Sequence, residues 1–290
     1  MRSIVLLTLL LSQALYADDG LFTMWQIEGA HNRIYLLGSV HLLRESDHPL
    51  PAMVDTAYAD AEALIMEIDM DDIDPIETQT LVTSLGVLRD GATLEELMGA
   101  RGWQEALAAA EAVDIPLELL NSSEPWLAAI TVEEMLLMRI GFNPLMGVEM
   151  HLMQRAVRDN KEILGLESIE EQLRFLDELS LEAQREMLLQ TLLESADIES
   201  LMDELINAWR NGDVDFMEET MLADMQQYTE LHDVIVAERN RRWIAAINEY
   251  MTHDDDYLII VGALHLVGDE GVPSLLRKQG TKIRQLPKVP

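Results

Sequence analysis

Two stretches near opposite ends of the chain, IYLLGSVHLL at residues 34–43 and LIIVGALHLV at residues 258–267, share one pattern. Each has four apolar residues, a glycine, two further residues, a histidine and an apolar pair, so that His41 aligns with His265. A short apolar run that ends at a glycine is typical of a buried parallel strand followed by a tight turn. Because ligands bind at the C-terminal edge of the strands in open α/β sheets, we expect both histidines at such an edge.

The rest of the sequence surrounds these two strands with a larger sheet and many helices. Further strands are predicted at residues 21–29, 63–69, 162–168 and 281–286, and short helices at residues 51–62 and 272–280. From about residue 76 to residue 250 the sequence is mostly amphipathic helix. The predicted fold class is α/β (α+β-like), with a central sheet built from N- and C-terminal strands and a large helical insertion at about 76–250. Residues 18–290 are expected to form this single domain.

The first 17 residues, MRSIVLLTLLLSQALYA, predict a secretory signal peptide. Arg2 precedes an apolar run, and small residues precede a plausible cleavage point after Ala17. The run is shorter than the roughly 20 residues that a membrane-spanning helix needs, and an uncleaved anchor is the alternative. We therefore expect a periplasmic or secreted bacterial protein with no membrane span after cleavage. The chain has no cysteine, which excludes disulfides, thiolate ligands and lipid attachment at cysteine.

The chain is strongly acidic, with a formal net charge of −33 from 53 acidic and 20 basic side chains. Nucleic-acid binding is excluded as a main function, because affinity for phosphate depends on clustered lysine and arginine. We interpret the charge first as a surface adapted to a salty exterior. A cationic substrate or partner is the alternative.

The paired histidines carry the main functional prediction. Imidazole is the commonest metal ligand in proteins and titrates near neutrality, so His41 and His265 indicate a metal site or an acid–base pair. The alternative is that each histidine only caps its strand. Glu67 is the natural third member, because it lies in a buried apolar strand and a buried carboxylate is costly unless it is paired or metal-bound. A Glu67 that faces solvent at a strand edge is again the alternative.

Other polar residues are weaker candidates. Glu149 in GVEMHL and Glu167 in GLES each follow a glycine by two residues. Arg239 and Asn240 belong to the basic run AERNRRW and could orient a carboxylate or stabilise an oxyanion, unless the run only forms a helix face paired with glutamates. The remaining histidines show no comparable setting: His31, His48, His151, His232 and His253. HExxH, GxSxG, Walker A, GxGxxG and EF-hand motifs are absent, which leaves several common enzyme classes without support.

In order and spacing, the segments GSVHLL, IMEID, GVEMHL, GLES, ERN and VGALHLVGDEGVPSLLRKQG resemble the TraB/GumN (TIKI-like) family over residues 22–287. The resemblance implies an α/β fold with a helical insertion, related to the erythromycin-esterase and ChaN-like superfamily. It also implies a metal-dependent protease, as described for TIKI members, whereas ChaN-like relatives bind haem. Leu264 departs from the glycine that many members carry at this position.

Residue by residue, the resemblance matches His41 and His265 to the two motif histidines, Glu67 to the early carboxylate, and Arg239 with Asn240 to the ERN motif. Together with the residue pattern, the resemblance predicts that the protein is an exported metal-dependent hydrolase, specifically a peptidase with a peptide or protein substrate.

In this prediction, His41, His265 and Glu67 hold a divalent Zn²⁺, Mn²⁺ or Co²⁺ ion. Glu67 or Glu149 serves as ligand or general base, and Arg239 with Asn240 steadies the oxyanion. The alternative is a non-catalytic protein of the same fold that binds haem or a peptide or pheromone-like ligand. The oligomeric state, including a homodimer, stays open.

Overall fold

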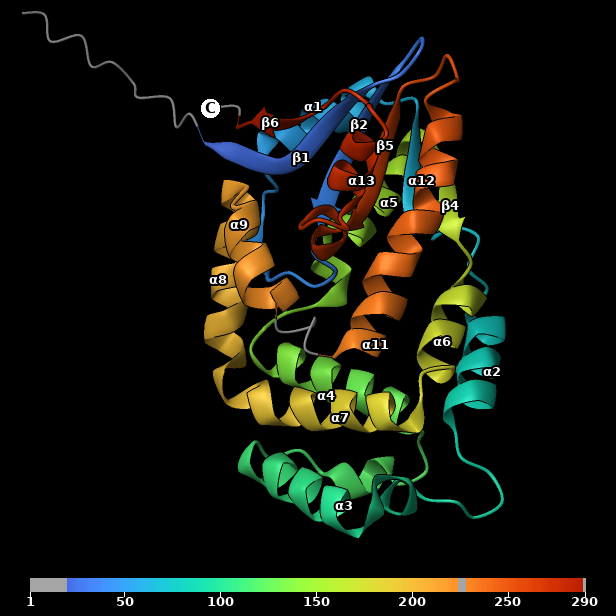
Figure 1. The fold of residues 1–290 in the computed structure, drawn as a ribbon, viewed down its shortest axis with the longest axis vertical. Helices are drawn as coiled ribbons and strands as arrows, with labels where there is room; N and C mark the ends of the chain where they lie inside the picture. Colours follow the sequence, from blue (N-terminus) through green and yellow to red (C-terminus); the bar gives the residue numbers. More distant parts are fainter. Residues whose placement is uncertain (1–19, 224–227, 289–290) are drawn as a thin grey trace, which may run out of the picture.

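A six-stranded mixed sheet organises the computed structural model, which describes residues 20–223 and 228–288 (Figure 1). The strands are β1 (Leu21–Glu28), β2 (Arg33–Ser39), β3 (Ala63–Ile68), β4 (Glu162–Glu167), β5 (Tyr257–Gly262) and β6 (Ile283–Pro287). Their order across the sheet is β4-β3-β5-β2-β1-β6. The fold class is therefore α/β as predicted, and the predicted signal peptide lies outside the described residues.

The sheet has a parallel part and an antiparallel part. Strand β5 pairs in parallel with β2 and β3, and β3 pairs in parallel with β4. Strand β1 pairs antiparallel with β2 and with β6. The sheet is thus completed by the C-terminal segment, as the sequence predicts. Strand β4 comes from within the helical insertion and forms one edge, so the insertion also contributes to the sheet.

Every residue of β5 is buried because helices cover both faces of the sheet. Leu258 and Ile260 join one apolar cluster, whereas Ile259 and Val261 join the other, which is the alternation expected of a strand. The first cluster packs against α1 (Ala52–Asp60), α5 (Val148–Asp159) and α8 (Ile198–Asn211). The second packs against α12 (Glu238–Tyr250) and α13 (Val272–Lys278).

The insertion builds a second layer beyond the C-terminal ends of the parallel strands (Figure 1). A third apolar cluster joins α3 (Leu94–Ala112), α4 (Pro125–Arg139) and α7 (Leu181–Leu193). Beside it, α2 (Pro75–Gly86) contacts α6 (Ile169–Asp177). Among the described residues, no helix is long and apolar enough to cross a membrane.

The return from the insertion to the sheet is irregular. After α9 (Val214–Phe216) comes a π-helical segment, η5 (Met217–Leu222), and α11 (Thr229–His232) leads into a second one, η6 (Asp233–Ala237). Helix α12 follows directly and begins with the Glu-Arg-Asn run. Wide π-helical turns often occur at functional sites.

Candidate active site

The parallel pairing of β2 and β5 brings the two pattern histidines to the same edge of the sheet. Ser39 is in register with Gly262, and Gly38 with Val261, so the two glycines are offset by one position. His41 follows the end of β2, whereas His265 lies in a short 3-10 turn, η7 (Ala263–Leu266), after β5. The two environments differ: the His41 side chain is 61% exposed and that of His265 is 8% exposed.

Gly262 lies at the centre of the site. A Cβ atom at this position would lie 3.4 Å from Glu67 Oε1, 3.5 Å from His41 Nε2 and 3.6 Å from His265 Cδ2. The Gly262 N–H donates a 2.8 Å hydrogen bond to Glu67 Oε1. The three residues predicted as metal ligands therefore surround one glycine.

His41 is held by a buried carboxylate. Its Nδ1 lies 2.7 Å from Glu149 Oε1, and the Ser39 hydroxyl donates to the same oxygen. The negative charge of Glu149 raises the pKa of His41 to about 10. Burial alone would raise the pKa of Glu149, but His41 and Ser39 lower it. Since Nδ1 faces Glu149, the free ring nitrogen is Nε2, which faces Gly262.

His265 is held by an amide instead. Its Nδ1 lies 2.7 Å from Asn240 Oδ1, and Asn240 Nδ2 donates to the His265 carbonyl at 3.2 Å. Because the amide oxygen can only accept, Nδ1 carries the proton and Nε2 the lone pair. Burial lowers the pKa of His265 to about 3, which keeps the ring neutral. Its Nε2 lies 3.1 Å from Arg239 Nη1 and 3.9 Å from Glu67 Oε1.

Arg239 connects the buried carboxylates. Its Nη2 lies 2.6 Å from Glu67 Oε2, and its Nε donates to Glu167 Oε2 at 3.0 Å. Burial would raise the pKa of Glu67, but the positive charges of His265, when it is protonated in acid, and of Arg239 outweigh burial and lower the value to about 2. Gln172 and Arg242 complete the network with bonds of 3.1 Å to Glu67 and Glu167, respectively. Such hydrogen-bonded pairs satisfy charges that would otherwise be too costly to bury.

A cavity of about 330 Å³ opens beside His41. Its walls are mostly apolar, and three methionines contribute to them. The lining residues are His41, Met66, Glu67, Ile68, Met70, Pro144, Glu149, Met150 and Gln172. The cavity can hold an apolar side chain next to the two carboxylates.

The structure brings together all six residues predicted for the site: His41, Glu67, Glu149, Arg239, Asn240 and His265. Arg239 contacts His265 and Glu67 directly, whereas both ends of the Asn240 amide are used to hold His265 and the Glu270 carbonyl. Ser39, Gln172 and Arg242 were not predicted. Nothing in the local sequence distinguishes Gln172 from other helical glutamines, although Ser39 lies inside the GxxH pattern.

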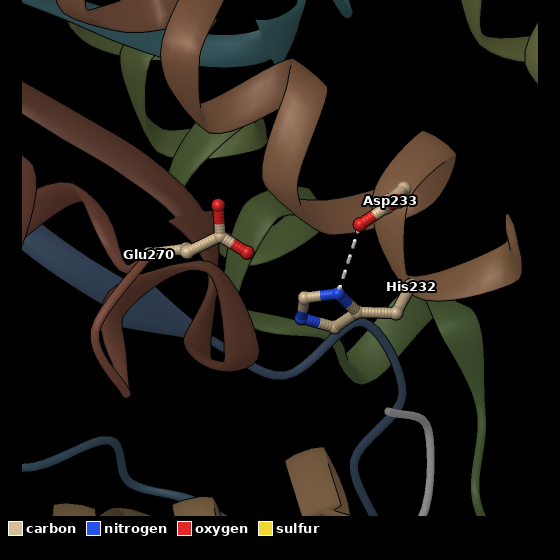
Figure 2. A group of neighbouring side chains, drawn as sticks. All are labelled: His232, Asp233 and Glu270. Atoms are coloured by element: carbon tan, nitrogen blue, oxygen red, sulfur yellow. Dashed lines mark ion pairs between the residues drawn. The ribbon is translucent and has the colours of Figure 1, made fainter. Parts of the chain in front are cut away.

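The group of side chains with the closest spacing of possible ligand atoms is not the one predicted from the sequence. Within residues 20–223 and 228–288, one group places three ligand atoms within 4.8 Å of one another, and it is His232, Asp233 and Glu270 (Figure 2). His41, Glu67 and His265 are therefore more widely spaced than this group. His232 lacks the GxxH pattern of the other two histidines, and the sequence did not single it out because its neighbour Glu270 comes from a distant loop.

The sheet with its helical insertion and the paired GxxH histidines define the class of the protein. The chain belongs to the TraB/PrgY/gumN family, whose model matches residues 23–285. Among curated proteins, it is similar to "Uncharacterized protein YbaP" of Escherichia coli K12, with 25% identity over 247 residues, 85% of this chain and 89% of that protein. The protein of the same name from Shigella flexneri is 25% identical over 243 residues, 84% of this chain and 87% of its own length. No solved structure matches the chain.

Proposed function

We propose that this chain is an exported metal-dependent hydrolase that cleaves peptides at the site around Gly262. The observation that carries the proposal is the orientation of the two histidines. In each ring Nδ1 is held by a buried partner, Glu149 or Asn240, which directs Nε2 toward the site. A bound ion would take the place of the proton on His41 Nε2 and of the hydrogen bond from Arg239 Nη1 to His265 Nε2. Histidines that bind metals nearly always have their second nitrogen held in this way, and the carboxylate–histidine pair is the commonest form.

The side chains of His41, Glu67 and His265 are chemically suited to bind a divalent ion. Two imidazole nitrogens and a carboxylate form the ligand set of many hydrolytic Zn²⁺ sites, and Mn²⁺ or Co²⁺ accepts the same ligands. Glu149 Oε2 is buried and has no hydrogen-bond partner among the described residues, so a further polar group is needed there. His41, Glu67 and His265 would hold the ion. A bound ion of this kind polarises a carbonyl group and lowers the pKa of water.

The chain's own residues supply the remaining functions. Glu149 lies at the cavity and holds His41 through Oε1, and its second oxygen, Oε2, can accept a proton from water and release it to the leaving group. The buried Arg239 guanidinium balances the negative charge of Glu67 and Glu167 and presents Nη1 toward the site. Asn240 is a positioning residue, because it acts through the orientation of His265. The apolar cavity is suited to an apolar side chain of the peptide next to the cleaved bond.

A peptide-library digest of the purified protein tests this proposal. Cleavage should stop with a chelator, return when Zn²⁺, Mn²⁺ or Co²⁺ is added, and be lost in His41→Ala. His151→Ala is the matched control, since His151 lies on α5 close to Glu149 in sequence but outside the site. Persistent cleavage in a His41→Ala/His265→Ala double variant would show that the site is elsewhere.

A non-catalytic binding role is the second candidate. It is favoured by the mostly apolar cavity beside an exposed histidine, a setting that also suits haem or an apolar peptide. Haem titration distinguishes the two functions. A Soret shift that disappears in His41→Ala, without peptide cleavage under any metal condition, would support binding in place of hydrolysis.

Export is part of the same proposal. The N-terminal residue of the mature protein and its presence in a periplasmic or culture fraction test it. A mature chain that starts at Asp18 is the expected result, and retention of Met1 in the cytoplasmic fraction would contradict it.

A further inference from the structure

A second group of ligand-type side chains includes Glu270, whose backbone carbonyl accepts a hydrogen bond from the Asn240 amide that also holds His265. His232 ends α11, Asp233 begins the π-helical segment η6, and Glu270 lies in the loop between η7 and α13. One ligand atom from each lies within 4.8 Å of the others. Figure 2 shows both carboxylate groups pointing toward the imidazole of His232. These three residues are called the His232 cluster below.

The histidine of the cluster is buried and lies close to a carboxylate. The side chain of His232 is 7% exposed, and its nearest charged group is Asp233, whose Oδ1 lies 3.6 Å from Nδ1. This separation is too long for a hydrogen bond. The two residues are therefore neighbours whose ligand atoms are near but not bonded to each other. A buried imidazole grouped with two carboxylates, one ligand atom of each within 4.8 Å of the others, is an arrangement that can hold a cation.

We propose that the His232 cluster binds a divalent transition-metal ion such as Zn²⁺. An imidazole nitrogen with two carboxylate oxygens favours Zn²⁺, Mn²⁺ or Co²⁺ over Mg²⁺ and Ca²⁺, which prefer oxygen ligands alone. Ligand atoms around a tetrahedral Zn²⁺ lie about 3.4 Å apart, so closure by roughly 1 Å is needed. Glu270 Oε1 also pairs with Arg241, which leaves its second oxygen for the ion. Three protein ligands leave room for water.

The ion would connect two segments that carry the candidate active site. His232 and Asp233 lie at the start of the continuous helical run that reaches Arg239, and Glu270 follows His265 by five residues. The same two segments are already joined where Asn240 Nδ2 donates to the Glu270 carbonyl at 2.9 Å. A bound ion therefore holds α12 against the η7 loop. Its function is to position Arg239 and His265, and its existence does not depend on the proposed hydrolysis.

Zn²⁺ stoichiometry and thermal unfolding test the proposal on the full-length mature protein. Asp233→Asn and Glu270→Gln should each lose one bound Zn²⁺ per chain relative to wild type. Asp269→Asn is the matched control, because Asp269 lies in the same loop with a side chain that is 98% exposed. In His41→Ala, Zn²⁺ at about 100 times its dissociation constant should still raise the unfolding midpoint by roughly 5 °C, and the further Glu270→Gln change should abolish the rise.

The design separates this proposal from the metal at the candidate active site. If only the His232 cluster binds, wild type and His41→Ala each hold one ion and Glu270→Gln holds none. If both sites bind, wild type holds two ions, and His41→Ala and Glu270→Gln each hold one. Equal Zn²⁺ content in Asp233→Asn, Glu270→Gln and Asp269→Asn would overturn the proposal. The two carboxylate variants carry the test because both side chains are partly exposed, so the fold tolerates their change.

Discussion

Replacing Arg239 with methionine should destabilise the protein strongly, because two buried carboxylates lose their shared partner. The side chains of Arg239, Glu67 and Glu167 are 8%, 11% and 3% exposed. Removing one member of a buried ion pair costs about 3–5 kcal/mol. The lowered pKa of Glu67 agrees in sign, because the Arg239 charge is one of the groups that stabilise its ionised form.

The pH dependence of the Arg239→Met variant has a definite sign. In the native protein the pKa of Glu67 is lowered, so its contribution is complete above pH 4.5 and is lost as the pH falls through about 2. Without Arg239, burial raises the pKa of Glu67 from its native value, and the penalty diminishes as Glu67 takes up a proton on acidification. The difference in unfolding free energy from wild type should therefore be smaller at pH 5 than at pH 8, by about 1 kcal/mol or more.

Urea unfolding at the two pH values, with a chelator present, measures this effect. The Arg239→Met/Glu67→Gln double variant should recover part of the lost stability, because it removes one unpaired charge. A penalty below about 1 kcal/mol, or one that is the same at both pH values, would refute the reasoning about the buried network.

Three further changes test individual parts of the site. Glu149→Gln should lower the pKa of His41 from about 10 toward 6.5, because the opposing charge is lost; an NMR titration that still gives a value above 9 would contradict this. Gly262→Ala places a methyl group in ordinary contact with Glu67 Oε1 at 3.4 Å, so hydrolysis should fall by roughly 100-fold while the unfolding midpoint stays unchanged; undiminished cleavage would place the reaction elsewhere. Gly147→Ala puts its Cβ 2.0 Å from the His41 carbonyl oxygen and should cost about 2 kcal/mol in urea unfolding; an unchanged free energy of unfolding would contradict this close approach.

The sequence predicts the sheet well because its strands are short, apolar and bounded by turn residues. It also predicts that His41 and His265 meet, since both follow parallel strands that end at glycine. Identical local patterns did not reveal that the two rings differ in exposure. That difference arises from their neighbours: the Glu149 carboxylate lies beside a solvent-facing His41, whereas the Trp243 ring of α12 covers His265, with ring centres 4.5 Å apart.

The parts of the site that sequence reasoning missed depend on the paths of helices and loops. Gln172 reaches Glu67 only because α6 starts directly after β4, next to β3. The His232 cluster joins residues 38 positions apart in the chain, and no periodic pattern connects them. Side-chain contacts of this kind are set by tertiary packing, which the period of a single helix or strand does not encode.

The position of β5 at the centre of the sheet has a consequence for the way the protein folds. Strands β2 and β3 are synthesised long before β5, yet each pairs with it. Contacts between distant parts of a chain form slowly, because the loop entropy is lost before the contacts stabilise the structure. Until β5 docks, the free edges of β2 and β3 can associate with other chains. The docking of β5 also brings Gly262 and His265 into place, so a partly folded chain has no assembled site.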